Sequence, residues 1–379
     1  MSTETVLSNA RIVLGDEIVT GSVTLRDGRI AAIDTGPSRT GEDFGGDYLM
    51  PGVVELHTDH LEGHYSPRPG VRWNMLGAVQ AHDAQVACSG ITTVFDCLRM
   101  GSDEDGGFDP AEMRDLADAI ERAMKEGRLR AEHKLHLRCE VSAPDVLDAF
   151  AAFREDPHVH LVSLMDHAPG QRQFQSMDAY IFYYKKKRGL SDAEFDAFVQ
   201  RRVDQSARYS APHRREIAEH CRARSIPMAS HDDATLAHVE EAVGEGVAVS
   251  EFPTTMEAAR AAHESGLSVL MGAPNIVRGG SHSGNIAASD LARAGVLDVL
   301  SSDYVPSSLL QAVFALARDV DAISLPQAAA LVTSTPARTV GLADRGSIAE
   351  GLRGDIIRVS AGDGIPVVRS VWREGRRVA

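Results

Sequence analysis

The sequence predicts an α/β protein: a (β/α)₈ TIM barrel with a small β-sandwich-like domain built from both ends of the chain. The 379 residues exceed a typical single domain. Strand-like apolar runs alternate with amphipathic helical patterns through the middle of the chain, over a length that suits a barrel of about 250 residues. Both ends carry short strand-like runs separated by turn signals. We place the composite small domain at residues 1–50 and 345–379, and the barrel at 51–344.

Both ends of the chain have sequence patterns typical of β-strands. Strand-like runs cover Ala10–Leu14, Gly21–Leu25 and Arg29–Ile33 near the N-terminus, and Asp355–Val359 and Pro366–Trp372 near the C-terminus. The dipeptides Asp27-Gly28 and Glu374-Gly375 read as turns within these regions. Neither end can bury a core alone, so we expect one joint domain that brings the termini close together.

The middle of the chain supplies about eight βα repeats. The expected strands are Val53–Asp59, Ile91–Asp96, Lys134–Glu140, Leu161–His167, Ile226–His231, Val247–Phe252, Leu267–Gly272 and Val296–Asp303. Helical patterns such as Pro110–Lys125, Ala211–Arg224 and Ala234–Val243 lie between them. A doubly wound sheet is the rival fold, but no GxGxxG motif follows the first strand.

An insertion over residues 171–210 interrupts the repeats. It contains the basic, aromatic stretch Tyr180–Arg188. This stretch fits a lid over the site. A solvated helical excursion with packed aromatic side chains fits equally well, and the sequence leaves the two open.

Composition limits the partners and the compartment. Hydrophobic residues make up 43%, charged residues 25%, and the net charge is −15. This charge argues against nucleic acid or an anionic membrane as a partner, but allows a small anionic substrate held by a metal and a few arginines. The N-terminus lacks a secretory signal and no segment reaches membrane-span length. The cysteines show no CxxC pair, which predicts reduced thiols in a cytoplasmic protein; the oligomeric state, including a homo-oligomer, stays open. They are Cys88, Cys97, Cys139 and Cys221.

Metal-ligand side chains recur where the expected barrel strands end. The C-terminal ends of barrel strands meet at one face, so residues from distant segments gather there. Imidazoles and carboxylates together suit Zn, Mn, Fe or Co, and a bridging carboxylate such as Glu140 would hold two ions about 4 Å apart. The candidate ligands are His57, Asp59, Glu140, His167, His231 and Asp303.

Two of these candidates carry more specific expectations. His57 and Asp59 lie two residues apart, so on a strand their side chains would share one face. Asp303, at the end of the last expected strand, suits a general base that takes a proton from a metal-activated water. Its alternative role is the N-cap of the next helix, which Pro306 or Ser307 could also fill.

Two further segments read as anion-binding loops for a phosphorylated substrate. The first, Asn275–Asn285, follows the seventh expected strand, where barrels of this type usually bind phosphate. Its glycines let backbone N–H groups approach an anion. Its candidate residues are Arg278, Gly279, Gly280, His282 and Ser283. In the second, Ser66–Trp73, prolines flank Arg68, and Arg68 and Arg72 could clamp phosphates; ordinary surface arginines are the alternative.

These residues resemble a known family. The strand-end ligands and the closing Ser334–Asp355 resemble the amidohydrolase superfamily over nearly the whole chain. More narrowly, several motifs look like the alpha-D-ribose 1-methylphosphonate 5-triphosphate diphosphatases of phosphonate catabolism. They are Glu55–Glu62, Pro67–Pro69, Ala81–Gln85, Gly90–Asp96, Asp166–Phe174 and Gly272–Asn285.

The resemblance implies a divalent-metal enzyme, with two ions, that hydrolyses a ribose 5-triphosphate to the 5-phosphate and pyrophosphate. The sequence departs from the wider pattern in three ways. The superfamily's first His-X-His pair is here His57 and Asp59, a site richer in oxygen. The family pattern has Asn at the position of His60, so this histidine is an extra ligand or a donor behind the ligands. The bridging lysine has no counterpart, and Glu140 takes its place.

Two rival functions remain at this point. A hydrolase of C–N bonds, such as a cyclic amidase or a deacetylase, could use the same metal centre. A non-catalytic barrel scaffold that has lost its metal is the rival from another class. The presence of Glu140, His231 and Asp303 argues against the scaffold.

Overall fold

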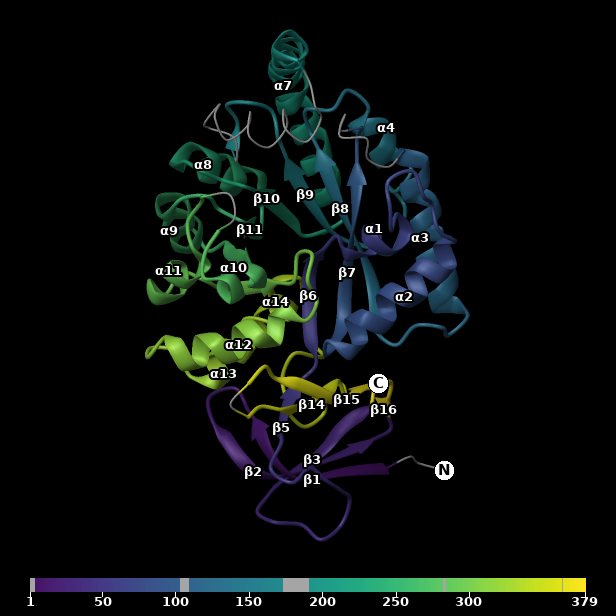
Figure 1. The fold of residues 1–379 in the computed structure, drawn as a ribbon, viewed down its shortest axis with the longest axis vertical. Coiled ribbons are helices and arrows are strands. Elements are labelled where there is room, and N and C mark those ends of the chain that lie inside the picture. Colours follow the sequence, from purple (N-terminus) through teal and green to yellow (C-terminus); the bar gives the residue numbers. More distant parts are fainter. Residues whose placement is uncertain (1–3, 103–108, 173–190, 282–283, 363) are drawn as a thin grey trace.

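A computed structural model of the protein describes residues 4–102, 109–172, 191–281, 284–362 and 364–379. It has two parts, a barrel of parallel strands surrounded by helices and a smaller sheet below it (Figure 1). Both termini lie in the smaller part. This is the predicted fold class. The exact domain limits, 1–50 with 345–379 and 51–344, stay a prediction.

The barrel is an eight-stranded parallel sheet in the order β6 to β13. Its strands are β6 (Val53–Thr58), β7 (Ile91–Met100), β8 (Glu132–Glu140), β9 (Val159–Met165), β10 (Met228–His231), β11 (Val249–Glu251), β12 (Ser268–Gly272) and β13 (Val299–Ser301). A parallel bridge between Thr58 and Asp303 joins the last strand to the first. The two ends of the sheet therefore meet just where the candidate ligands lie.

The smaller sheet combines strands from both ends of the chain, in the order β16-β15-β14-β5-β1-β2-β3, with β4 paired to β1. Its strands are β1 (Glu4–Val13), β2 (Ile18–Arg26), β3 (Arg29–Thr35), β4 (Glu42–Asp43), β5 (Tyr48–Pro51), β14 (Ile356–Ser360), β15 (Val367–Arg373) and β16 (Arg376–Arg377). The predicted turn at Asp27-Gly28 is confirmed, with φ of 50° and 82° at its two residues. Such positive φ values are what a two-residue hairpin loop of type I′ requires.

Helices follow the barrel strands on the outside (Figure 1). They are α1 (His60–Tyr65), α2 (Met75–Cys88), α3 (Pro110–Lys125), α4 (Val146–Ala151), α7 (Asp192–Ala223), α8 (Leu236–Glu245), α9 (Met256–Glu264), α10 (Ala273–Arg278), α11 (Ala288–Arg293), α12 (Ser308–Asp319), α13 (Leu325–Ala330) and α14 (Ser334–Thr339). The predicted helix Pro110–Lys125 is exact, and a capping box at Asp109 and Glu112 starts it. None of the described helices has the length and apolarity to cross a membrane.

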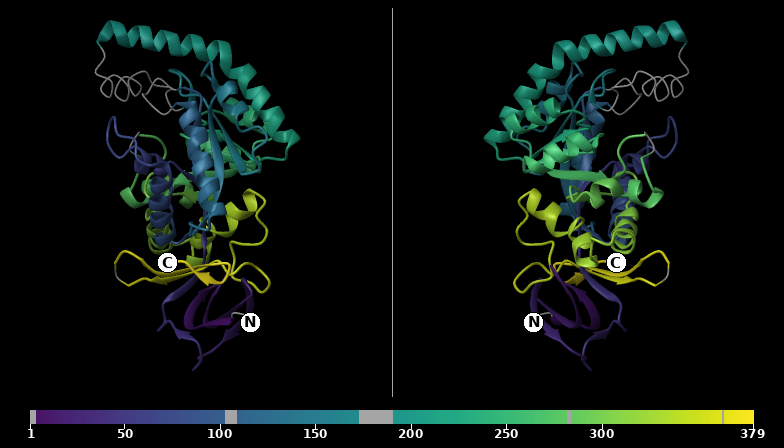
Figure 2. Two further views of the ribbon diagram at one scale, coloured as in Figure 1. Left: turned by 90° about the vertical axis from the view of Figure 1, so that its right-hand side faces the viewer. Right: turned by 90° about the vertical axis from the view of Figure 1, so that its left-hand side faces the viewer.

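Helix α7 is longer than the sequence predicted. The expected helix Ala211–Arg224 is only its second half, and the described part of the insertion, from Asp192 onward, forms its first half. Pro212 lies inside this helix, which bends on its way across the top of the barrel (Figure 2). The described part of the insertion is therefore helical. The lid predicted for Tyr180–Arg188 lies outside the described residues.

Apolar side chains fill the floor of the barrel. They come from successive strands and are fully buried, as in Phe95, Leu161 and Val249. A larger cluster packs between the barrel and its helices, and a third forms the core of the smaller sheet. Apolar side chains therefore close one end of the barrel, and the polar side chains of the strands lie toward the other end, where the strands finish.

The expected barrel strands differ from the observed ones by one to four residues at an end, and two of these differences affect the site most directly. Strand β6 ends at Thr58, and Asp59 is the residue before helix α1, with φ of −102° and ψ of 15°. The same-face argument for His57 and Asp59 therefore fails, because Asp59 has left the strand. Strand β7 runs on to Met100, so Asp96 lies within the strand.

Candidate metal centre

A layer of polar side chains lies directly above the apolar floor. Side chains two residues apart on a strand share a face, so Cys97 lies above Phe95, Ser163 above Leu161, and Glu251 above Val249. These polar side chains are buried. The barrel interior is therefore apolar at one level and polar at the next level, two residues further along each strand.

Glu251 joins two of the predicted ligands. Its Oε1 lies 3.0 Å from Nδ1 of His57, and its Oε2 lies 3.1 Å from Nδ1 of His231. Ser163 Oγ also donates to Oε2 at 2.7 Å. Burial opposes ionisation, but His57 and the neighbouring His136 hold the pKa of Glu251 well below its ordinary value. The charged carboxylate therefore fixes the orientation of both imidazole rings, which stack at 5.7 Å between centroids.

His167 is oriented in the same manner by a different carboxylate. Its Nδ1 lies 2.6 Å from Oε2 of Glu140, and its Nε2 lies 3.7 Å from Oδ2 of Asp232. The Nε2 of His231 lies 3.6 Å from that same oxygen. Burial alone would lower the pKa of His167, but the charges of Glu140 and Asp232 raise it to about 10. His167, His231 and Asp232 form a corner whose ligand atoms all lie within 4.8 Å of one another.

Asp232 and Asp303 share an unusual backbone conformation. Their φ values are 58° and 54°, in the left-handed region that non-glycine residues seldom adopt. Backbone hydrogen bonds hold both: Asp232 N donates to Glu251 O, and Asp303 N donates to His57 O. Strained residues fixed this way are typical of functional sites. The conformation directs both carboxyl groups into the barrel mouth instead of along the strand.

Three carboxyl groups approach one another at this mouth. Burial and the neighbouring charges of Asp59 and Asp232 raise the pKa of Asp303 to about 6. Arg138 opposes this rise, and its Nη1 lies 3.4 Å from Oδ2 of Asp59. Carboxylates that repel one another beside imidazole nitrogens are a donor set that a divalent cation would stabilise. The residues present therefore fit a divalent metal ion of the Zn, Mn or Fe type.

The chain matches known proteins along its whole length. No protein-family model matches it. It is 48% identical over 376 residues to the alpha-D-ribose 1-methylphosphonate 5-triphosphate diphosphatase of Escherichia coli (strain K12), which covers 98% of this chain and 100% of that protein. The chain belongs to this diphosphatase family. The family resemblance predicted from the motifs is confirmed.

Solved structures extend the likeness to the fold of the diphosphatase. An amidohydrolase from a Sargasso Sea environmental sample superposes with a TM-score of 0.65 at 18% identity, covering 100% of this chain and 93% of that one. The N-acetyl-D-glucosamine-6-phosphate deacetylase of Mycobacterium smegmatis gives a TM-score of 0.62 at 15% identity, covering 99% of both chains. The diphosphatase thus has the amidohydrolase fold.

The predicted ligands of the diphosphatase reach the barrel mouth by different routes. His57 and His231 lie in the last two positions of β6 and β10, whereas His167 and Asp303 lie two residues beyond β9 and β13. Asp59 joins them as the residue before α1. Their assignment as metal ligands stays a prediction.

Glu140 takes a more specific place than expected. Its oxygens contact His167, Ser142 and Arg202, whose Nη2 lies 3.1 Å away. Burial would raise the pKa of Glu140, but His167 and Arg202 hold it far below its ordinary value. In this arrangement Glu140 supports His167 from behind, and the bridging of two ions by Glu140 stays a prediction.

Sequence reasoning missed three residues of the site: Arg138, Asp232 and Glu251. Glu251 is the last residue of β11, so the strand-end rule that found His231 applies to it as well. Asp232 directly follows His231, and Arg138 is two residues before Glu140 on β8. The signal was present for each of them, but we expected the sixth strand to end at Phe252, one residue after Glu251.

Three of the predicted anion-binding residues, Arg278, Gly279 and Gly280, lie at the end of helix α10 and directly after it. Arg278 ends helix α10 and is exposed, and Gly279 and Gly280 follow with φ of 79° and 154°. Their backbone can therefore turn in ways that other residues rarely allow. His282 and Ser283 lie outside the described residues.

The two arginines of the other predicted anion-binding loop, Arg68 and Arg72, differ in their contacts. Arg68 is exposed on the loop after α1. Arg72 Nε lies 2.8 Å from Oε1 of Glu112, and its Nη1 lies 3.0 Å from Ser66 Oγ. Arg72 is thus engaged by the protein, and its role as a phosphate clamp stays a prediction.

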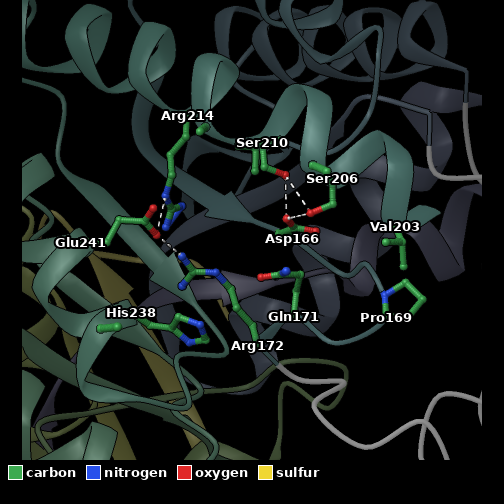
Figure 3. A pocket seen from close by; sticks show the side chains of 14 residues that line it. Asp166, Pro169, Gln171, Arg172, Val203, Ser206, Ser210, Arg214, His238 and Glu241 are labelled. Carbon is green, nitrogen blue, oxygen red and sulfur yellow. Dashed lines mark hydrogen bonds and ion pairs between the residues drawn. The ribbon is translucent and has the colours of Figure 1, made fainter. Parts of the chain in front are cut away.

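A pocket of about 470 Å³ adjoins the loop that carries His167 (Figure 3). Helix α7 supplies Ser206 and Ser210, whose hydroxyls donate to Oδ2 of Asp166 at 2.7 and 2.6 Å. Asp166 is the residue before His167. The pocket wall thus fastens the start of this loop to α7.

The opposite wall of the pocket is built from charged side chains. Arg172 Nη2 and Arg214 Nε lie 2.6 and 3.1 Å from the same oxygen of Glu241 (Figure 3). Both arginines are buried, at 5% and 3% exposure, so pairing with carboxylates is what makes their burial tolerable. These pairs join Arg172 to α8, so the described part of the loop, residues 166–172, is held at both of its ends.

Proposed function

We propose that this enzyme hydrolyses alpha-D-ribose 1-methylphosphonate 5-triphosphate to the 5-phosphate and pyrophosphate. The reaction breaks the anhydride bond between the α and β phosphates and adds one water. The single observation that carries this proposal is the full-length match at 48% identity to the Escherichia coli diphosphatase. The geometry agrees with it, because a base and metal-ligand groups share one buried mouth.

Asp303 is the group that we assign as general base. It lies at the closing seam of the barrel, where its N–H is bonded to His57 O and its carbonyl accepts from Thr58 Oγ1 at 3.0 Å. Its raised pKa, about 6, strengthens it as a proton acceptor near neutral pH. The N-cap position of α12 belongs to Ser307, so Asp303 is not needed there.

We propose two divalent ions, drawn from Zn, Mn and Fe, at this mouth. The ligands we assign are His57, Asp59, His167, His231 and Asp303, with Asp232 as a further donor and Glu140 and Glu251 positioning the histidines. When bound, such ions polarise a phosphoryl oxygen and lower the pKa of water. Two observations support this proposal. Possible ligand atoms form more than one cluster, and they lie on both sides of the bridge that joins the last barrel strand to the first.

For the substrate, we assign the triphosphate to the loop that begins at Arg278. Its guanidinium and the backbone N–H groups of Gly279 and Gly280 are donors that suit phosphate oxygens. Arg68, Arg72, His282 and Ser283 complete the set predicted from sequence. The bound ions and these donors would offset the net charge of −15 locally.

The decisive test is a panel of phosphorylated ribosides with product identification. Pyrophosphate release from the ribose 5-triphosphate, reduced by about 10² to 10⁴ in Asp303→Asn, is the expected result. Orthophosphate as the sole product would overturn the proposed bond. Turnover of cyclic amides or N-acetyl sugars instead would point to the C–N hydrolase. Metal analysis of protein purified without chelators gives the number of ions, and a metal-free protein with no turnover would favour the scaffold.

A further inference from the structure

The candidate metal centre described above, with His57, His167, His231 and Asp303, is called the strand-end centre below. Three other histidines gather beside the barrel. His60 and His64 lie four residues apart on α1, so they share one helical face. His82 lies on α2, and both helices lie next to strand β7 (Figure 1). One ring nitrogen from each histidine lies within 4.8 Å of the other two. The cluster shares no residue with the strand-end centre.

The spacing of the nitrogens suits a metal ion. Nδ1 of His60 and Nδ1 of His82 are 3.4 Å apart, which is long for a hydrogen bond between them. A tetrahedral zinc ion with Zn–N bonds of about 2.05 Å separates its ligand nitrogens by about 3.3 Å. The two atoms therefore already lie at the distance that a shared ion would impose.

His64 supplies a second, independent observation. Its Nε2 is buried and makes no hydrogen bond to any residue in the described part of the chain. Buried polar atoms are normally paired, so this nitrogen indicates an absent partner. Burial and the neighbouring His82 ring lower the pKa of His64, which keeps the ring neutral and its lone pair available.

The third observation concerns the orientation of His82. Its Nε2 lies 2.8 Å from Oδ1 of Asp96, and Oδ2 of that carboxylate lies 2.7 Å from Nδ1 of His133. Burial opposes ionisation of Asp96, but His133 and His82 hold its pKa far below the ordinary value. The charged Asp96 accepts from Nε2–H, so the lone pair of His82 is on Nδ1 and faces His60. Metal-binding histidines are typically oriented by a carboxylate in this way.

Asp96 lies within strand β7, so the alternation of the strand decides which way its side chain points. Phe95 and Cys97 point into the barrel, so Asp96 between them points outward, toward α2. His133, on the neighbouring strand β8, also bonds Asp83 of α2 at 3.3 Å. Two strands and a helix thus hold the carboxylate that orients His82.

We propose that His60, His64 and His82 form a separate binding site for a transition-metal ion of the Zn²⁺ class. Three imidazole ligands favour Zn²⁺, Co²⁺, Ni²⁺ or Cu²⁺ over Mg²⁺ or Ca²⁺, which prefer oxygen ligands. Three protein ligands leave a fourth tetrahedral position for water.

The test measures metal binding directly, without any activity assay. Purified protein is stripped with a chelator and titrated with Zn²⁺ and with Co²⁺, and the bound ions are counted by elemental analysis. The variants are His60→Asn and His64→Gln, both on the partly exposed helix α1. His158→Gln is the matched control, because this histidine pairs with Asp156 before β9, at the opposite end of the barrel. Circular dichroism and thermal unfolding check that each variant folds.

We expect the wild type and His158→Gln to bind one ion more than either α1 variant, or to bind it at least tenfold more tightly. The Co²⁺-loaded wild type should also show a visible absorption component that both variants lose. A His231→Asn variant, altered only in the strand-end centre, should keep that component. Equal stoichiometry and identical Co²⁺ spectra in the wild type and both α1 variants would overturn the proposal.

Discussion

Nδ1 of His167 donates a hydrogen bond to Oε2 of Glu140 across 2.6 Å, between the ends of neighbouring strands β9 and β8. The bond turns Nε2 of the same ring toward Asp232, where Nε2 of His231 also points. In this centre each histidine ring is therefore oriented by a carboxylate that contacts its Nδ1. Glu140 orients His167, and Glu251 orients both His57 and His231. The first two predictions test these supports.

Glu140→Gln should lower metal affinity by about 10- to 100-fold and keep the fold, because the amide loses the charge that orients His167. Metal titration of the stripped variant, followed by turnover at saturating metal, measures the effect. Glu240→Gln, at an exposed glutamate of α8, is the control. If Glu140 instead bridges two ions, saturating metal will fail to restore turnover.

Glu251→Gln should be more damaging, since one carboxylate serves two histidines. The amide can accept from one Nδ1–H, but its NH₂ group would then face the other donor. We expect weaker metal binding than in Glu140→Gln and a loss of about 1–3 kcal/mol in the free energy of unfolding of the metal-free protein. Urea unfolding measures the second effect. A variant as stable as the wild type, with normal metal content, would contradict the role given to Glu251.

Arg278→Ala should raise KM for the triphosphate by roughly tenfold and change kcat little, because an exposed rim charge binds ground state and transition state alike. Initial-rate kinetics at two ionic strengths measure it, and the effect should shrink at high salt. Arg293→Ala is the control, since Arg293 pairs with Asp290 on α11. An unchanged KM would remove this loop from the triphosphate site.

Glu132 joins the barrel to the C-terminal segment. Its Oε2 lies 2.8 Å from Nη1 of Arg345 and also contacts Arg353, and its Oε1 lies 3.0 Å from Nζ of Lys134. Burial would raise the pKa of Glu132, but Arg345, Lys134 and Arg353 hold it well below its ordinary value. A carboxyl with a lowered folded-state pKa stabilises the protein above its unfolded pKa, about 4.3, and loses this contribution as the pH falls further.

Glu132→Gln should therefore lower the free energy of unfolding at pH 7 by about 1–3 kcal/mol. The difference from the wild type should shrink below about pH 4, because the Glu132 carboxyl of the unfolded wild type takes up its proton there while the folded one stays charged. Denaturant unfolding between pH 3 and 7 measures both effects. Glu126→Gln, in the exposed pair with Arg122, should change stability little at any pH. A pH-independent difference for Glu132→Gln would contradict the assigned charge.

Several features of the fold and site could be predicted from the sequence because they depend on local patterns. The apolar runs gave all eight barrel strands, and the rule that strand ends meet at one face brought His57, His167, His231 and Asp303 together. The turn at Asp27-Gly28 followed from its residue types. The motifs gave the diphosphatase family, which the full-length match confirms.

Tertiary structure decided what each side chain faces. The sequence could not show that Glu140 lies behind His167, that Asp59 leaves strand β6, or that Glu251 lies between two histidines. It also could not show that His60 faces His82 of α2. The physical reason is that strand periodicity determines which face a residue occupies, whereas the hydrogen-bond partners lie far apart in the chain. His57 and Glu251, for example, are 194 positions apart and meet only when the barrel closes.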